Sequence, residues 1–301
     1  MPEKLPGVER AAQPEADGPS GPSVSAVLVS FNQATALRRA IEALERSKER
    51  ERLEILVVDC GSQDESPRLD TDYPSVQILR LPQHFGATRA MNIAMRTAKA
   101  ELVLLLSPSV EVAPDTVMRL AARIEDEASA AAVCPLLCDP SGQPAPQVYR
   151  IPSAEALAAG ALEPVGLDLT QESIPLEEYA GRDALLVRKQ FIRGMNYFDE
   201  RFGEYWADLD LAMQIRRAGK KIRLYPSIRA TLHPDPDPMQ GDAVAQADRI
   251  LGAAAFVGKY GGAFAGFRFR LAAILKALAR FDFGGAGRLM SGEKIGSQAG
   301  R

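Results

Sequence analysis

The feature that most constrains the fold of this chain is a repeated alternation of short apolar runs with amphipathic segments. The apolar runs are too short for buried helices and rich in the branched side chains of central strands. They are Val24–Phe31, Leu53–Val58, Val76–Leu81 and Glu101–Leu106. Between the first two, Leu37, Ala40, Ile41 and Leu44 recur at a spacing of three to four residues, which is typical of an amphipathic helix. Strands that alternate with helices predict βαβ units, and therefore an α/β fold with a mostly parallel sheet flanked by helices.

The remaining segments extend this pattern less regularly. Further helices are predicted at Gly86–Ala98, Pro114–Glu127 and Asp208–Ala218, and then over residues 242–260 and 266–281. Further strands are predicted at Ala184–Arg188, Lys221–Tyr225 and Ile228–Leu232. The segment 141–180 is rich in Pro, Gly, Glu and Ala and gives no clear assignment.

Three regions follow from these patterns. Residues 1–22 hold five prolines and three glycines without an apolar core, which predicts a flexible leader and excludes a secretory signal. Residues 23–240 form the predicted α/β domain, and residues 241–301 form a helical, basic C-terminal extension. The longest sharply apolar run, Leu102–Leu106, is far shorter than the roughly 18 residues of a spanning helix.

Composition excludes several classes of protein. The formal net charge of -3 and a pI near 5.7 argue against a nucleic-acid partner. Two histidines and three cysteines cannot form a multi-zinc module or a disulfide scaffold. Sparse, unpaired cysteines fit a reducing compartment, so we expect a cytoplasmic protein, at most peripheral on the inner face of a membrane.

In open α/β sheets, ligands bind beyond the carboxyl ends of the strands. The segments predicted to lie there are Ser30-Phe31-Asn32, Asp59-Cys60-Gly61-Ser62, Ser107-Pro108-Ser109 and the loop before Asp208. Asp59 could also serve only as a cap for the turn that follows its strand. Cys134 and Cys138 have no second cysteine pair, so they are better interpreted as buried thiols than as metal ligands.

Several motifs occur in an order that resembles the family 2 glycosyltransferases of GT-A fold, particularly their rhamnosyltransferase-like branch. Strand ends at Ser30-Phe31-Asn32 and Asp59-Cys60-Gly61-Ser62 precede the helix entrance Gly86-Ala87-Thr88-Arg89-Ala90-Met91-Asn92, which has the pattern Gly-x-x-x-Ala-x-Asn. Later come Phe198-Asp199-Glu200, Asp208-Leu209-Asp210, Arg216-Arg217-Ala218-Gly219, Pro226 and His233. The resemblance covers about residues 24–235.

The resemblance implies a nucleotide-sugar donor, a UDP- or dTDP-sugar, and inverting transfer to an acceptor hydroxyl of a glycan or lipid-linked glycan in cell wall or polysaccharide biosynthesis. It implies that Ser30, Phe31 and Asn32 border the base and ribose, and that Asp59 accepts a hydrogen bond from the pyrimidine imide. Gly61 and Ser62 would give a turn with close backbone approach. Gly86 and Arg89 would open a helix that faces the diphosphate.

The same resemblance assigns the chemistry to one carboxylate. Inverting transfer needs a base for the acceptor proton, and the family's base is the first Asp of Glu-Asp-x-Asp. Here the segment reads Ala207-Asp208-Leu209-Asp210, so Asp208 is kept and the preceding Glu is replaced. Asp208 and Asp210 are therefore the predicted catalytic residues, and Asp208 is also a credible N-cap of the helix that follows. Tyr205 and Trp206 could stack on an acceptor sugar; alternatively they are loop aromatics that close the core.

Two departures from the family concern the metal. The family's Asp-x-Asp or Asn-Pro-Asp motif is replaced by Ser107-Pro108-Ser109, which lacks an anionic ligand. His233 matches the family's metal-binding histidine, but one histidine without carboxylates makes a poor site for Mg²⁺ or Mn²⁺. We therefore expect weak or absent metal dependence. His84 stands where the family usually has Asn, and could help to stabilise the diphosphate with Arg89, His233 or a base of the extension.

The sequence leaves two possible functions open. One is an active glycosyltransferase with weakened metal dependence. The other is a catalytically impaired relative that binds a nucleotide sugar or glycan, or acts as a partner subunit. A sugar nucleotidyltransferase needs a Gly-rich loop after the first strand, and Ser30-Phe31-Asn32-Gln33-Ala34-Thr35 has no glycine.

The extension carries six bases and one acid between Lys259 and Arg288, interleaved with Phe and Leu. Such a segment suits an anionic membrane surface, and we predict a contact through residues 261–281. The alternative is a helix that packs on the domain and keeps its bases in water.

Overall fold

The computed structural model describes residues 21–296, so nearly all of the predicted leader lies outside the described residues. The sheet strands are β1 (Val24–Ser30), β2 (Leu53–Asp59), β3 (Val76–Arg80), β4 (Leu102–Leu106), β5 (Val110–Val112), β6 (Ala130–Cys138), β8 (Ile174–Leu176), β10 (Ala184–Arg188) and β11 (Lys221–Leu232). Two short strands, β7 (Val148–Tyr149) and β9 (Tyr179–Ala180), pair separately. No helix within this range is both long and apolar enough to cross a bilayer.

The helices fall into the predicted places, with additions. They are α1 (Ala34–Glu45), α2 (Ala87–Thr97), α3 (Thr116–Asp126), α4 (Ala154–Ala159), α5 (Lys189–Gly194), α6 (Ala207–Arg217), α7 (Ala243–Gly261), α8 (Ala263–Ala279) and α9 (Phe283–Ser291). Three 3₁₀ turns complete the described chain: η1 (Arg50–Arg52), η2 (Ser66–Thr71) and η3 (Glu200–Phe202).

The large sheet has the order β3-β2-β1-β4-β10-β6-β11-β5, with β8 on the outer side of β11. Strands β1 to β4 are mutually parallel, and β10 enters between β4 and β6 in the opposite direction. Because β10, β5 and β8 are the reversed strands, the sheet is mostly parallel, which confirms the predicted fold class.

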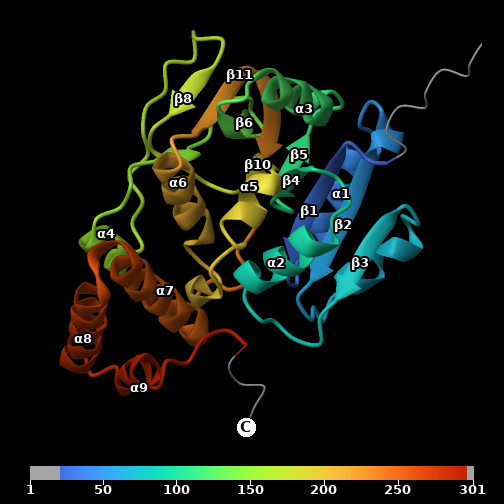
Figure 1. Cartoon of the computed structure of the whole chain (residues 1–301). Helices are drawn as coiled ribbons and strands as arrows, with labels where there is room; N and C mark the ends of the chain where they lie inside the picture. The colour runs from blue at the N-terminus through green and yellow to red at the C-terminus, as the bar shows by residue number, and fades with distance from the viewer. Residues whose placement is uncertain (1–20, 297–301) are drawn as a thin grey trace, which may run out of the picture.

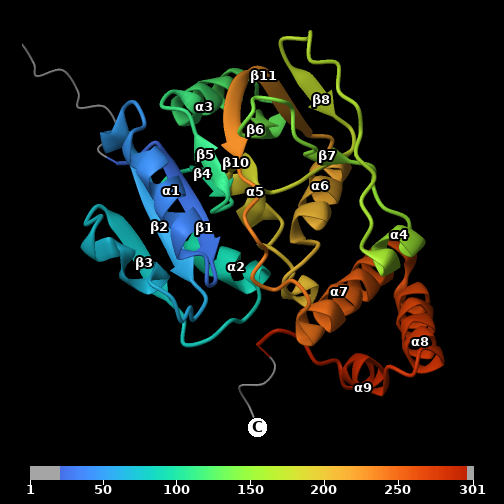
Figure 2. The same cartoon turned by 180° about the vertical axis from the view of Figure 1, so that it is seen from behind.

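Helices cover both faces of this sheet (Figures 1 and 2). On one face, Leu37 and Ile41 of α1 and Leu120 of α3 pack with side chains of β1 and β2 such as Leu28 and Val57. On the other face, α2, α6 and α7 share a second core. Alternate residues of each central strand belong to opposite cores, which is why these strands read as continuous apolar runs.

Sequence patterns missed one central strand and divided another. Ala130–Cys138 is buried along its whole length, but its small residues and Pro135 do not resemble a strand in the sequence. The two strands predicted at Lys221–Tyr225 and Ile228–Leu232 are one strand, β11, with a shift of pairing register between Tyr225 and Arg229.

The C-terminal helices α7, α8 and α9 gather at the end of the molecule opposite β3 (Figure 1). Helix α7 packs closely on η3, because a Cβ atom at Gly252 would lie 2.8 Å from the Phe202 carbonyl oxygen and 3.1 Å from Trp206 Cδ1. This glycine therefore fixes the distance between the extension and the α/β domain.

We expect Gly252→Ala to lower the free energy of unfolding by about 1–3 kcal/mol, since overpacking outweighs the gain in helix propensity. Gly287→Ala is the matched control, because Gly287 is also helical but a Cβ atom there would meet no other atom within 4 Å. It should gain about 1 kcal/mol. Urea unfolding of both variants measures the difference; equal effects would contradict the close packing of α7 on η3.

Candidate functional site

The loops after β1 and β2 are tied together at the edge of the sheet. The Cys60 amide donates to the Ser30 carbonyl at 2.8 Å, and the Asn32 amide donates to Ser62 Oγ at 2.8 Å. Asn32 has a positive φ of 50°, and its Oδ1 accepts from the Gln63 amide at 2.7 Å. These contacts arise because Ser30 and Asp59 are directly paired at the ends of parallel strands. The structure thus brings the first group of predicted donor-site residues into one place.

Asp59 has one oxygen engaged and one free. Its side chain is 1 % exposed, and Oδ2 accepts from the amides of Gly61 (3.2 Å) and Ser62 (3.1 Å). Its Oδ1 is buried and has no hydrogen-bond partner in the described part of the chain. A buried carboxylate oxygen without a donor is costly, so Oδ1 is a position at which a ligand N–H would be stabilised. The turn-capping role and a binding role for Asp59 are thus compatible.

Gly61 holds this turn against the next loop. Its φ is 76°, and a Cβ atom there would lie 2.7 Å from Gln83 Cα. Both the backbone conformation and the space require glycine.

Phe31 and His84 form a wall beside Asp59. Their rings meet edge to face with centroids 4.7 Å apart. The Gly86 amide donates to His84 Nδ1 at 3.0 Å, so the proton of the neutral ring lies on Nε2, 3.4 Å from Glu204 Oε2. Burial lowers the pKa of His84 to about 4, against the opposing charge of Asp59. His84 is therefore neutral at pH 7, and cannot supply the positive charge considered for it above.

The N-terminus of α2 is already bound to a carboxylate. Gly86, with φ 88°, is the N-cap, and the Ala87 amide donates to Glu204 Oε2 at 2.7 Å. Burial raises the pKa of Glu204, and the nearby Arg182 opposes that shift. Arg89 is exposed, with its guanidinium 4.7 Å from the centroid of the Phe85 ring. The structure therefore places Gly86 beside the predicted site and Arg89 on the adjoining surface.

A cavity of about 170 Å³ lies below the ends of β1 and β4. Its polar lining comes from Gln33, Ser107, Arg182, Asp183 and Glu204. Arg182 donates to the Glu204 carbonyl at 3.3 Å, while its Nη1 is buried without a hydrogen-bond partner among residues 21–296. The cavity thus contains a cation with a free donor.

Arg182 and Asp183 were not predicted as site residues. They directly precede the predicted strand Ala184–Arg188, which is β10 in the structure. Because β10 is antiparallel to β4, its amino end lies at the same edge as the carboxyl ends of the parallel strands. The sequence could have indicated these two residues only if the direction of β10 in the sheet had been known.

Asp208 faces this group from α6. The Tyr179 hydroxyl donates to its Oδ2 at 2.8 Å, and the Leu209 amide donates to its Oδ1 at 2.9 Å. Burial acts to lower the pKa of Arg182, but the charges of Asp208 and its neighbours raise that pKa overall. The predicted N-cap role of Asp208 is wrong, because α6 begins at Ala207 with Trp206 at the N-cap in a left-handed conformation. Asp208 is half-buried, and each of its carboxylate oxygens accepts one of these hydrogen bonds.

Asp210 points away from Asp208, since residues two apart on a helix are about 200° apart around its axis. Asp210 is fully buried and bonds the Lys259 ammonium (2.9 Å from Oδ2) and the Tyr260 hydroxyl (2.6 Å from Oδ1). The structure therefore does not bring Asp210 to the other predicted site residues. It uses Asp210 to join α6 to α7.

The two predicted acceptor aromatics differ in position. Trp206 is 6 % exposed, lies in the core beneath α7 and donates from Nε1 to the Arg249 carbonyl at 2.9 Å. Tyr205 is half-buried and lines a cavity of about 590 Å³ with residues of the 235–242 loop. Of the two, only Tyr205 lies on a surface that a ligand can reach.

His233 and Ser109 come together at the β5 edge. The His233 amide donates to the Ser109 carbonyl at 2.9 Å, and His233 Nε2 lies 3.0 Å from Glu111 Oε2. One imidazole and one carboxylate are too few for a hard divalent cation. No group of three or more His, Cys, Asp or Glu side chains in the described range could hold a metal ion. The residues at the predicted metal position do not fit a metal on their own.

Comparisons with known proteins bear on the family and the fold. Residues 25–177, about half of the chain, match the family model described as Glycosyl transferase family 2. An N-acetylglucosaminyl-diphospho-decaprenol L-rhamnosyltransferase of Mycobacterium tuberculosis is 27 % identical over 233 residues, which cover 69 % of this chain and 75 % of that protein.

Solved structures share the fold at low identity. GalNAc-T7 with UDP, GalNAc and Mn²⁺ has a TM-score of 0.57 and 17 % identity; the match covers 72 % of this chain and 44 % of that one. The mannosyltransferase PcManGT of Pyrobaculum calidifontis, in complex with GDP-Man and Mn²⁺, has a TM-score of 0.55 and 16 % identity. That match covers 90 % of this chain and 79 % of the other.

We expect Asp210→Asn to lower the free energy of unfolding by about 1–3 kcal/mol, because the partly exposed Lys259 ammonium loses its buried partner and keeps Asp199, 3.6 Å away. Asp72→Asn breaks an exposed pair with Arg38 and should change stability by less than about 1 kcal/mol. Chemical unfolding of the two variants measures both effects. Similar small losses would show that Asp210 does not anchor α7.

The burial of neutral His84 predicts that the free energy of unfolding depends on pH. Its pKa is about 4 in the folded chain, whereas an unperturbed histidine titrates near 6.5. The unfolded state therefore binds a proton first as the pH falls, so stability is lost from about pH 6.5 down to about pH 4. Between pH 7 and pH 5, wild type should lose about 2 kcal/mol more than His84→Gln. Parallel curves of unfolding free energy against pH would contradict the burial of a neutral His84.

Proposed function

Because the chain belongs to glycosyl transferase family 2, with the GT-A fold, we propose that it transfers a sugar from a UDP- or dTDP-sugar to an acceptor hydroxyl of a glycan or lipid-linked glycan. The relative from Mycobacterium tuberculosis, whose name specifies a diphospho-decaprenol acceptor, supports the lipid-linked alternative. It also supports a place in cell wall or polysaccharide biosynthesis.

The free oxygen of Asp59 is the observation on which this proposal mainly rests. In uracil and thymine the imide N–H lies between two carbonyl groups and needs an acceptor. Asp59 Oδ1 is a buried acceptor without a donor in the described residues, and it lies at the carboxyl end of β2, the end at which open α/β sheets bind ligands. Phe31 and His84 provide flat faces beside it, and Ser30 Oγ is a second buried polar atom without a partner in the described residues.

Asp208 is the proposed base. Its carboxylate receives the proton of the acceptor hydroxyl while that oxygen attacks the anomeric carbon from the face opposite the leaving diphosphate. This displacement inverts the configuration. Tyr179, through its 2.8 Å hydrogen bond, holds the carboxylate in one orientation. Tyr205 is the remaining candidate for contact with the acceptor.

The leaving diphosphate must be neutralised. Arg182 has a free Nη1 and lines the cavity with Ser107, so it is the proposed cation of this step. The two similar solved structures are complexes with Mn²⁺, and a metal here would have to be held by His233 and Glu111 together with the donor's own phosphates. We propose weak metal dependence because Ser109 supplies no carboxylate.

One observation favours the second candidate, a protein that binds a nucleotide sugar or glycan without turnover. Glu204 occupies the amide of Ala87 at the N-terminus of α2, where the resemblance predicts the diphosphate. Three carboxylates (Asp183, Glu204 and Asp208) act to raise the pKa of Arg182, and their negative charges offset part of its attraction for a diphosphate. A diphosphate could bind there only after Glu204 moves or is protonated.

The test incubates the pure protein with UDP- and dTDP-sugars and an acceptor glycan, with Mn²⁺ or with EDTA. We expect Asp208→Asn to lower the transfer rate by at least about 10²-fold, because the base is lost. Donor affinity should change little, since the proposed role of Asp208 concerns the acceptor hydroxyl. EDTA should lower the rate less than about tenfold. A larger loss is expected of an enzyme that depends on its metal, because a bound metal can contribute several kcal/mol to the reaction.

Three results would contradict parts of this proposal. Unchanged transfer by Asp208→Asn would remove the base assignment. A steep dependence on Mn²⁺ would contradict the weak metal site. Donor binding by calorimetry without transfer or hydrolysis would favour the non-catalytic candidate.

A further inference from the structure

Helix α8 presents an exposed apolar stripe. Phe264, Phe267, Leu271, Leu275 and Leu278 follow one another at intervals of three or four residues, so they lie on one side of the helix. Their exposed fractions range from 37 % for Leu278 to 72 % for Phe264. From Phe264 to Leu278 the stripe runs about 21 Å along the helix axis.

This exposure is confined to the extension. Within residues 21–296, every large hydrophobic side chain that is exposed lies between Phe264 and Met290, and those outside the stripe are Phe281, Phe283 and Met290. A contiguous patch of this kind marks a contact surface, because water-exposed Phe and Leu are otherwise scattered singly.

The surroundings of the stripe are basic. Helix α8 contains Arg268, Arg270 and Lys276 and no acidic residue, and Arg280 is its C-cap. The guanidinium of Arg268 lies 5.9 Å from the centroid of the Phe264 ring, at the border of the stripe. Two acids line the groove beside α8, Glu155 and Asp282, and Asp282 caps α9 through the Gly285 amide at 2.7 Å.

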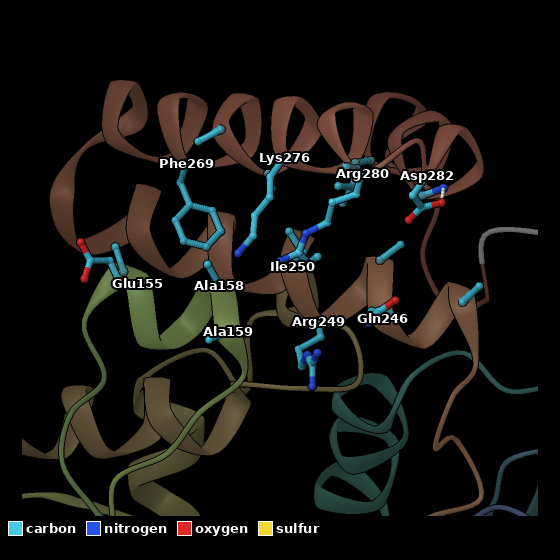
Figure 3. Close-up of a pocket in the computed structure, with 18 residues that line it drawn as sticks. Glu155, Ala158, Ala159, Gln246, Arg249, Ile250, Phe269, Lys276, Arg280 and Asp282 are labelled. Carbon is cyan, nitrogen blue, oxygen red and sulfur yellow. Dashed lines mark hydrogen bonds between the residues drawn. The ribbon is translucent and has the colours of Figure 1, made fainter.

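Lys276 and Arg280 leave α8 on the side of α7, where they extend over a groove of about 560 Å³ lined largely by alanine (Figure 3). Neither has an ion-pair partner in the part of the chain that the structure describes.

We propose that α8 is a docking surface for an anionic phospholipid bilayer, with the Phe264–Leu278 stripe in the acyl–headgroup boundary. Arg268, at the border of the stripe, would face lipid phosphates, and the other bases of the helix would add positive potential near the surface. A helix with an apolar face, aromatic residues and a basic remainder lies in the plane of such an interface. A second copy of the chain fits less well, because two basic α8 helices would repel each other across the stripe. The inference goes beyond the proposed function and does not depend on it.

Co-sedimentation with vesicles tests the proposal on the full chain. We expect binding to phosphatidylglycerol vesicles, weak binding to phosphatidylcholine vesicles, and release at high salt. The stripe variant Phe264→Ser/Phe267→Ser/Leu271→Ser should lower the partition coefficient at least about tenfold, because apolar insertion is lost. These positions are exposed, so thermal unfolding should show that the variant keeps its fold.

The charge variant Arg268→Gln/Lys276→Gln/Arg280→Gln should also lower binding to anionic vesicles at least about tenfold, since each base near the surface contributes. The matched control is Lys48→Gln/Arg68→Gln/Arg216→Gln, which removes three exposed bases outside the extension. The control should bind like wild type.

Insertion itself is tested by a bimane label on Phe267→Cys, because the three native cysteines are buried. The emission should shift to the blue on anionic vesicles, while a label on Lys48→Cys should not respond. The proposal is overturned if the wild-type protein binds neither vesicle type, or if the stripe variant binds anionic vesicles with the wild-type partition coefficient. It is also overturned if sedimentation shows a dimer that the stripe substitutions abolish and that vesicles do not dissociate.

Discussion

Strand β1 lies between two parallel neighbours, and the rest of the structure depends on this pairing. Its register places Ser30 opposite Asp59 and Leu28 opposite Leu106, so three strands end at one edge. Each strand is buried on both faces and cannot shift by one residue without exchanging its two cores. The loops that follow must therefore meet, and polar side chains that are far apart in the sequence form one site.

Helix α6 shows how one short motif can serve two purposes. Asp208 bonds Tyr179 and acts on Arg182, while Asp210 is buried against Lys259 and Tyr260. The first carboxylate is partly accessible and suited to chemistry. The second fixes the C-terminal helices to the domain, and its burial makes that connection rigid. A carboxylate pair in the sequence is thus divided by the helical repeat into a functional and a structural residue.

Charge around the candidate site is balanced without a cluster of metal ligands in the described residues. Arg182 lies among Asp183, Glu204 and Asp208, and His84 is held neutral by burial. Glu204 also binds the start of α2. The electrostatic setting of a bound diphosphate would therefore depend on how Glu204 and Arg182 respond to it, more than on the two histidines that the sequence motifs single out.

The sequence by itself determined the α/β class, most element positions from Val24 to Arg217, and the strand-end loops with Asp59 and Asp208. Apolar periodicity and turn residues are local properties, so they can be recognised without the fold. It did not determine the direction of β10, the burial of β6, or the partners of Asp210 and Trp206. Those depend on packing between segments distant in the chain. Only the tertiary structure decided that Arg182 faces the cavity, because an antiparallel strand carries its amino end to that edge.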